Sequence, residues 1–289
     1  MLLKDELINR YEYSSRLIRE IKRNGCMKVN GESVWVNEKL KKDDRIEIVM
    51  PAEKIDGIPT PGPIIIVYED DEILVVNKAP YCITHPTGNH QENTLANYVS
   101  FHWQSSDESA KVRFINRLDR DTTGLIAIAK NKYVHHYVQK QMSDQTTLKR
   151  YRAYVYGKPK QAQGIIEAPI ALLHEDSFTR VVTDSGQEAI THYQVIEEFK
   201  DACLMEVELK TGRTHQIRVH MKHLGTPIIG DPLYYTDASD IFSQKMAMPH
   251  QALHAAELKI RLPIHGQKHF KAAMHQDMLE LHKKLLKND

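Results

Sequence analysis

The stretch Arg113–Lys130 reads R-F-I-N-R-L-D-R-D-T-T-G-L-I-A-I-A-K and combines a charged loop with an apolar run. Its second half, Leu125–Ala129, is a short apolar run entered through a Thr-Thr-Gly turn signal, which predicts a buried strand. Asp119 then lies on a loop just ahead of that strand, between Arg117 and Arg120. A carboxylate that is fixed at its base and flanked by opposite charge suits a nucleophile. Loops with surface ion pairs are commoner, so other segments must decide between the two interpretations.

The composition indicates a globular chain. Its 289 residues are 41% hydrophobic and 27% charged, enough for one large domain or two domains. No run of about 18 apolar residues occurs, and charged residues follow Met1–Leu3 at once, so we expect a cytoplasmic protein without membrane contact. The three cysteines are widely spaced and predict neither a disulfide framework nor a cysteine zinc site. A net charge of +1 argues against a uniformly basic surface but leaves local patches open.

Residues 1–52 are predicted to form a small unit of their own. Ser14 and Ser15 can cap a helix that Gly25 stops. At helical spacing the apolar residues of this segment share one side, and a basic stripe fills an adjoining side: Arg16, Arg19, Lys22 and Arg23. An Asn-Gly turn then separates two short strands, as in a hairpin. The stripe is either an ordinary solvated helix face or a surface that binds phosphates.

Residues 53–63 are predicted to be a linker, since they are rich in Pro and Gly and can sustain neither a helix nor a central strand. The segment 64–289 would form the second domain. Many strand patterns and few helical ones predict an α+β fold, built on a largely antiparallel mixed sheet with flanking helices. The last of the expected helices runs from Lys271 to Lys287.

A second candidate residue is Tyr151. In the strand pattern Lys149–Gly157, alternation places Tyr151, Ala153 and Val155 on one face. A half-buried aromatic is the commonest use of a strand tyrosine, so the position alone assigns no chemistry.

The third informative segment, Thr211–Gly225, reads T-G-R-T-H-Q-I-R-V-H-M-K-H-L-G. Here Gly212 predicts a turn into a helix, and His215, Arg218 and Lys222 recur at helical spacing as a basic face near its start. Such a face attracts phosphate or carboxylate groups. His215 and His220 are five residues apart, on different sides of a helix, and no H-E-x-x-H pattern occurs, so we predict no metal site.

These segments resemble the RluA-type pseudouridine synthase family. The resemblance rests on N-R-L-D-R-D-T-T-G-L, L-K-R-Y-R-A-Y-V-Y-G and T-G-R-T-H-Q-I-R-V-H-M-K-H-L-G, and it covers about residues 64–265. Asn116 stands where that family often has His, and Lys78-Ala79-Pro80 replaces a more usual Lys-Pro. The N-terminal unit, with G-C-M-K-V-N-G-E-S-V, resembles the small RNA-binding domain first recognised in ribosomal protein S-four.

The resemblance implies an RNA pseudouridine synthase that flips a uridine out of structured RNA. Asp119 would be the nucleophile, attacking ribose or base, and Tyr151 would stack on the uracil. Arg218 would pair with Asp119, with Arg213 as the second choice. Arg117 would fill the space that the uridine leaves, and His215 and the basic stripe would contact the RNA.

The isomerisation needs no redox partner or group donor, so no cofactor is expected, and no dinucleotide or P-loop motif occurs. Ribosomal RNA of the large subunit is the preferred substrate, with transfer RNA as the alternative, and a monomer is expected. A non-catalytic RNA-binding assembly factor would explain residues 1–52 but not the three candidate residues. A glycoside hydrolase would need a second carboxylate facing Asp119, and Asp121 is too close in sequence.

Overall fold

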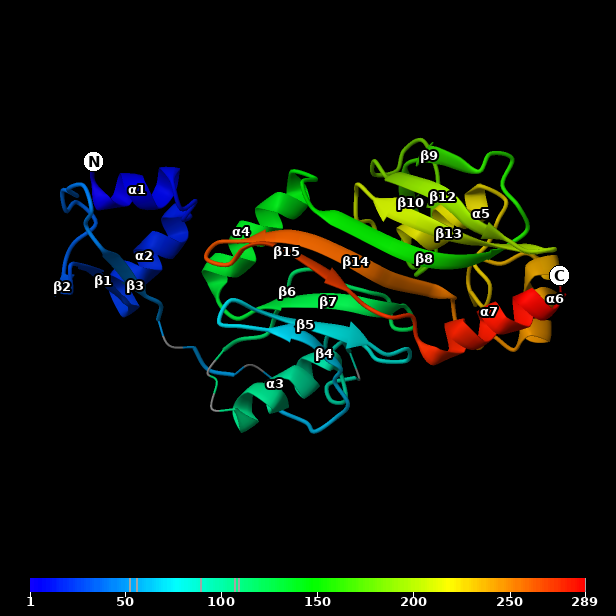
Figure 1. Ribbon diagram of the computed structural model, residues 1–289, viewed down its shortest axis with the longest axis horizontal. Coiled ribbons are helices and arrows are strands. Elements are labelled where there is room, and N and C mark those ends of the chain that lie inside the picture. Colours follow the sequence, from blue (N-terminus) through cyan, green and yellow to red (C-terminus); the bar gives the residue numbers. More distant parts are fainter. Residues whose placement is uncertain (52, 56, 89, 107, 109, 289) are drawn as a thin grey trace.

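The computed structural model describes residues 1–51, 53–55, 57–88, 90–106, 108 and 110–288 (Figure 1). Its helices are α1 (Leu3–Asn9), α2 (Ser15–Asn24), α3 (Leu95–Ser105), α4 (Lys132–Ser143), α5 (Gln216–His223), α6 (Asp237–Met246) and α7 (Gln276–Asn288). Its strands are β1 (Cys26–Val29), β2 (Glu32–Ser33), β3 (Ile46–Val49), β4 (Ile66–Glu69), β5 (Ile73–Lys78), β6 (Arg113–Phe114), β7 (Thr123–Ala129), β8 (Leu148–Tyr156), β9 (Gln163–Glu167), β10 (Ile170–Leu172), β11 (Arg180–Val182), β12 (Ile190–Glu198), β13 (Ala202–Leu209), β14 (Leu253–Leu262) and β15 (Gly266–Lys271). This is the α+β fold that the sequence predicts.

The N-terminal unit is built from α1, α2 and a small sheet in the order β2-β1-β3 (Figure 1). Helix α2 begins as predicted, because the Ser14 hydroxyl accepts a hydrogen bond from the backbone N–H of Leu17 at 3.1 Å. Gly25 ends the helix, and a Cβ there would lie 2.5 Å from the carbonyl oxygen of Val49. The apolar side of α2 is buried in a core of its own, while the residues of the basic stripe are exposed.

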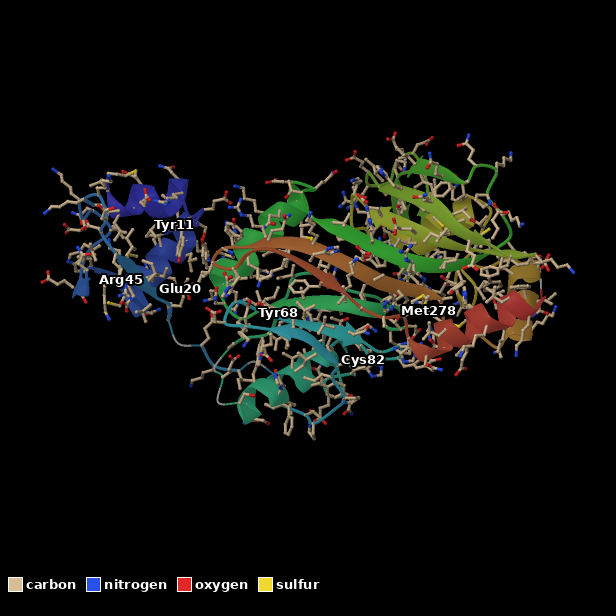
Figure 2. The ribbon with its side chains drawn as sticks, in the orientation of Figure 1. Tyr11, Glu20, Arg45, Tyr68, Cys82 and Met278 are labelled. Carbon is tan, nitrogen blue, oxygen red and sulfur yellow. The ribbon has the colours of Figure 1, made fainter. Side chains whose placement is uncertain are left out.

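Helix α4 supplies the contacts that hold this unit against the larger part. The rings of Tyr13 and Tyr133 stack with centroids 4.1 Å apart, and the Tyr133 hydroxyl donates to the Tyr11 carbonyl oxygen at 2.7 Å. Lys132 forms an ion pair with Glu20. Figure 2 shows Tyr11 and Glu20 on the side of the unit that faces α4. The two parts therefore share a contact with both apolar and polar components.

The segment between the two parts has neither helix nor strand among its described residues; Ala52 and Asp56 lie outside them. It is nevertheless attached to the larger part. Arg113 donates two hydrogen bonds of 2.6 Å to the carboxylate of Glu53, and the Asn97 amide donates to the Ile58 carbonyl oxygen at 2.7 Å. The backbone thus follows a defined path, as a bound segment rather than a free spacer would.

One ten-stranded sheet forms the frame of the larger part, in the order β4-β5-β7-β14-β8-β13-β12-β9, with β15 beside β14 and β6 beside β7. Every pair is antiparallel except β7 with β14. Gly124 makes that parallel contact possible: its φ is +110°, and a Cβ there would lie 2.4 Å from the carbonyl oxygen of Ala255. The sheet is thus mixed and largely antiparallel, as expected.

Both faces of this sheet are covered, which explains why all seven residues of β7 are buried. Leu74 and Ile126 belong to the core beneath α3, α5, α6 and α7. Their sequence neighbours Ile73 and Leu125 point the other way, into the core beneath α4. A strand with two covered faces reads as a continuous apolar run, which is the pattern of the Leu125–Ala129 segment.

The start of the predicted C-terminal helix is wrong. The helix predicted for Lys271–Lys287 begins at Gln276, and β15, which the sequence pattern did not show, ends at Lys271. With one buried apolar residue, Phe270, β15 lacks a clear alternation, and its pairing with β14 decides its conformation. Among the described residues, no helix is both long and apolar enough to cross a membrane.

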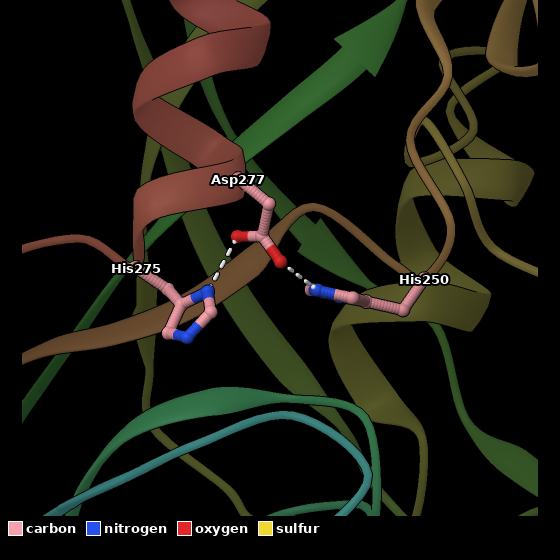
Figure 3. Close-up of side chains that lie close together, drawn as sticks. All are labelled: His250, His275 and Asp277. Atoms are coloured by element: carbon pink, nitrogen blue, oxygen red, sulfur yellow. Dashed lines mark hydrogen bonds and ion pairs between the residues drawn. The ribbon is translucent and has the colours of Figure 1, made fainter.

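The N-terminus of α7 is fixed by three polar side chains (Figure 3). The Asp277 carboxylate accepts hydrogen bonds from His250 Nε2 at 2.5 Å and from His275 Nδ1 at 2.8 Å. Burial raises the pKa of Asp277, but the hydrogen bonds and charges of the two histidines outweigh this effect and lower the pKa to about 2. The cluster joins α7 to the loop that leads into β14.

Candidate active site

A cleft of about 740 Å³ brings together the three segments that the sequence singles out. Its lining includes Asp119 from the loop between β6 and β7, Tyr151 from β8 and Arg218 from α5. These residues are up to 99 positions apart in the chain. Strands β7, β14 and β8 are neighbours at the centre of the sheet. The Asp119 loop, which leads into β7, therefore lies close to Tyr151 on β8.

Asp119 and Arg218 are in direct contact. Arg218 Nη1 donates to Asp119 Oδ2 at 2.9 Å. The Asp119 side chain is 26% exposed and faces the cleft, whereas that of Arg218 is 5% exposed. The charge-assisted bond therefore holds one oxygen of a carboxylate that solvent or substrate can still reach.

Arg218 is itself held by Asp231, which follows α5. Its Nε and Nη2 donate to the two oxygens of Asp231 at 2.7 and 2.8 Å, a bidentate pair, and the Asp231 side chain is fully buried. The guanidinium also lies 5.0 Å from the ring centre of Tyr234. Burial lowers the pKa of Arg218, but the carboxylates of Asp231 and Asp119 outweigh burial and raise it above its ordinary value. Arg218 is thus a fixed positive charge.

Backbone hydrogen bonds hold the loop that carries Asp119. The ammonium group of Lys78 donates to the carbonyl oxygens of Arg120, Ala79 and Cys82 at 2.7, 2.9 and 3.0 Å. Burial lowers the pKa of Lys78 to about 8. Sequence reasoning missed this role, although a lysine at the end of a largely apolar strand is an unusual signal.

Asn116, the departure from the family pattern, is part of the same support. Its amide nitrogen donates to the Leu125 carbonyl oxygen and its amide oxygen accepts from the Ala127 N–H, both at 2.9 Å. The side chain therefore pairs with the backbone of β7 and does not enter the chemistry of Asp119 directly. The neighbouring Arg120 and Asp121 form an ion pair of 2.8 Å with each other.

Tyr151 lies in the same cleft with 7% of its surface exposed. Burial raises the pKa of its phenol, and the negative charge of Asp119 raises it further. The side chain is therefore a neutral phenol with a flat aromatic ring, beside a carboxylate. Such a ring can stack on a base and can also donate a proton.

The other candidate residues, all of them basic, lie in different places. Arg117 is exposed and lines the cleft. Arg213 is also exposed, and its Nε donates to the Glu188 carbonyl oxygen at 2.9 Å, so it is Arg218 that contacts Asp119. The residues of the basic stripe on α2 are outside the cleft lining.

The expected basic face forms only in part: His215 and Arg218 both lie beside the Asp119 carboxylate, whereas Lys222 is outside the cleft lining. His215 precedes α5 with a φ of +58°, Arg218 is buried and Lys222 is exposed. The turn places His215 beside the carboxylate, with Nε2 3.8 Å from Asp119 Oδ2. Burial is the main cause that lowers the pKa of His215.

Known proteins resemble this chain in sequence and in fold. Residues 72–223 match the family described as RNA pseudouridylate synthase. The chain is 36% identical to the uncharacterized RNA pseudouridine synthase YjbO of Bacillus subtilis, over 93% of this chain and 94% of that protein. It is also 36% identical to the ribosomal large subunit pseudouridine synthase D of Zymomonas mobilis, over 94% of this chain and 90% of that protein.

Among solved structures, the fold is similar to that of human RNA pseudouridylate synthase domain containing 4, with a TM-score of 0.64 and 23% identity. That match covers 77% of this chain and 93% of the human chain. The sequence matches show that the chain belongs to the RNA pseudouridylate synthase family and is an isomerase that converts uridine to pseudouridine in RNA.

Proposed function

We propose that this pseudouridine synthase modifies large-subunit ribosomal RNA and that Asp119 is its nucleophile. The observation that carries the proposal is the contact of Asp119 with the buried Arg218 in a cleft that also contains Tyr151. The relatives named ribosomal large subunit pseudouridine synthase D support the choice of substrate. Transfer RNA is the alternative substrate that the test below distinguishes.

The reaction breaks the bond between C1′ of the ribose and N1 of uracil and forms a bond from C1′ to C5. N1 ends with a proton and C5 loses one, so atoms and charge balance without a donor. An ionised Asp119 supplies the electron pair for a covalent intermediate, on ribose or on base. The fixed charge of Arg218 stabilises that carboxylate and keeps it in place while the detached uracil turns.

Tyr151 is the proposed stacking partner of the uracil. Flipping a stacked uridine out of RNA costs about a few kcal/mol. Stacking on one aromatic ring returns on the order of 1–3 kcal/mol, so the two terms roughly cancel. Because the phenol stays neutral, Tyr151 can also pass a proton near C5 or N1.

Arg117 is proposed to fill the space that the uridine leaves in the RNA. It is exposed at the cleft and two residues before Asp119, so it reaches the RNA as the uridine enters. The basic stripe of α2 and Arg213 would contact phosphates. We also propose the domain division 1–52, 53–63 and 64–289, with an S-four type RNA-binding role for the first unit; a cytoplasmic location and a monomeric state stay predictions.

The decisive experiment replaces Asp119 by Asn and measures uridine isomerisation and RNA binding in parallel. We expect the loss of detectable isomerisation with RNA affinity within about threefold of the wild type, since shape and hydrogen-bonding capacity are nearly kept. Asp201→Asn, an exposed turn residue, is the matched control. An active Asp119→Asn enzyme would contradict the proposed role.

The substrate is identified by mapping pseudouridines in cellular RNA with and without the enzyme. Loss of a modification in large-subunit ribosomal RNA, restored by the wild type but not by Asp119→Asn, is the expected result. Loss that is confined to transfer RNA would replace the proposed substrate with the alternative one.

A further inference from the structure

His215 is held in an unusual backbone conformation between the turn at Gly212 and the start of α5. Its φ of +58° is in the left-handed region, which residues other than glycine seldom adopt. Such conformations persist where the surroundings impose them, and they are frequent in active sites. The result here is that the imidazole, with 16% of its side chain exposed, faces the cleft beside Asp119.

Tyr234 determines which nitrogen of this imidazole carries the proton. The Tyr234 hydroxyl oxygen accepts a hydrogen bond from the backbone N–H of Arg180 at 2.9 Å. The same hydroxyl lies 2.8 Å from Nδ1 of His215, and its hydrogen has no other acceptor among the residues that the structure describes. The phenol therefore donates to Nδ1, so the proton of a neutral imidazole is on Nε2. Burial lowers the pKa of His215, which favours this neutral form.

The Nε2 atom of His215 lies near one oxygen of Asp119. Nε2 lies 3.8 Å from Oδ2, the oxygen that already accepts from Arg218 at 2.9 Å. Oδ1 accepts no hydrogen bond from any described residue and remains available to a substrate. A separation of 3.8 Å is too long for a hydrogen bond, but such contacts in active sites shorten when the substrate binds.

We propose that His215 is a positioning residue for Asp119: as the Nε2–H tautomer set by Tyr234, it donates to Oδ2 once a uridine fills the cleft. With Oδ2 held by both Arg218 and His215, the carboxylate cannot rotate about its Cβ–Cγ bond, and Oδ1 is the oxygen that attacks. The inference rests on the proposed role of Asp119 as nucleophile. Beyond the charged donor Arg218, the proposal gives Asp119 a neutral hydrogen-bond donor. In the substrate-bound state three hydrogen bonds would connect the Arg180 N–H, through Tyr234 and His215, to Asp119.

Two substitutions of His215 separate the donor from the imidazole ring. In His215→Gln the amide nitrogen reaches the position of Nε2, so the donor is kept. In His215→Asn it reaches only the position of Nδ1, and asparagine tolerates a positive φ, so the donor is lost without added backbone strain. We expect His215→Asn to lower kcat about 100-fold with KM within about threefold, and His215→Gln to retain kcat within about tenfold.

Tyr234→Phe tests the tautomer. The ring beside Arg218 is kept, and only the hydroxyl is removed. We expect ¹⁵N NMR of the imidazole to show a protonated Nε2 and an unprotonated Nδ1 in the wild type, and a mixture of tautomers in Tyr234→Phe, with kcat lower by about tenfold. Tyr235→Phe, the exposed neighbour, is the matched control and should behave as the wild type.

Equal kcat values for His215→Asn and His215→Gln, or a proton on Nδ1 in the wild type, would overturn the inference. If the His215 variants are fully active while Asp119→Asn is inactive, only the positioning role fails. If Asp119→Asn is active as well, the proposed nucleophile fails with it.

Discussion

The two basic regions of the molecule use charge in opposite ways. On α2, Arg16, Arg19, Lys22 and Arg23 are exposed, and the cation of Lys22 lies 5.9 Å from the ring centre of the exposed Trp35. In the cleft, Arg218 is buried, and two carboxylates take three of its N–H groups. Exposed cations suit the uniform charge of an RNA backbone. The buried Arg218, which its bidentate pair with Asp231 holds in place, instead fixes the position of one carboxylate, Asp119.

This difference predicts that removing the buried charge that holds Arg218 destabilises the protein, while removing the exposed charge on α2 changes only RNA affinity. The strongest effect is expected for Asp231→Asn, which leaves Arg218 buried without its bidentate partner. The free energy of unfolding should fall by about 3–5 kcal/mol. Urea unfolding measures this loss, with Asp201→Asn as the exposed control. A change below about 1 kcal/mol would show that Arg218 does not depend on Asp231.

A smaller loss of stability is expected when the hydrogen bonds of Asp277 at the start of α7 are weakened (Figure 3). Asp277→Asn removes the charge that accepts from His250 and His275, and unfolding should become easier by about 2 kcal/mol. The pKa of Asp277 is about 2 in the folded chain, below its value of about 4 in an unfolded chain.

Because the pKa of Asp277 is lower in the folded chain than in the unfolded chain, its contribution to stability depends on pH. The stabilisation by Asp277 is complete above about pH 4 and disappears as the pH falls toward 2. The difference in unfolding free energy between the wild type and Asp277→Asn should shrink over that interval. A difference that is constant from pH 5 to pH 2 would mean that the carboxylate does not titrate with a lowered pKa.

Neutralising the basic stripe tests whether the exposed cations of α2 bind RNA. With Arg16, Arg19, Lys22 and Arg23 all changed to Gln, RNA affinity should fall by about tenfold at moderate salt. The slope of log affinity against log salt should decrease by up to about 3, because fewer counterions are released. The kcat at saturating RNA and the free energy of unfolding should stay unchanged, since the four side chains are exposed. Unchanged affinity and slope would exclude α2 as an RNA contact.

The smallest effect is expected at the contact between the two parts. Tyr133→Phe removes the hydrogen bond to the Tyr11 carbonyl oxygen but keeps the ring stack on Tyr13, so it should cost about 1 kcal/mol. Hydrogen exchange in α2 would detect looser packing of the N-terminal unit. Tyr137→Phe on the same helix is the control, and equal exchange rates in both variants would assign the hydrogen bond no role.

Much of the fold follows from local patterns in the chain. The cap at Ser14 and the stop at Gly25 predict α2, and the apolar run before Lys130 predicts β7, because these signals depend on neighbouring residues. Asp119 could be proposed from its place ahead of that strand. By contrast, β15 and the start of α7 could not be predicted, since the pairing of β15 with β14 decides them.

The chemistry of the site was only partly readable from the sequence. Sequence alone determined the candidate nucleophile, the strand tyrosine and the turn with two arginines. Tertiary structure decided that Arg218 and not Arg213 contacts Asp119, that Asp231 and Lys78 support the site, and that His215 faces the carboxylate. The reason is physical: a local pattern specifies which residues share a face or a turn, but a contact between residues 99 positions apart depends on how the whole sheet brings its segments together.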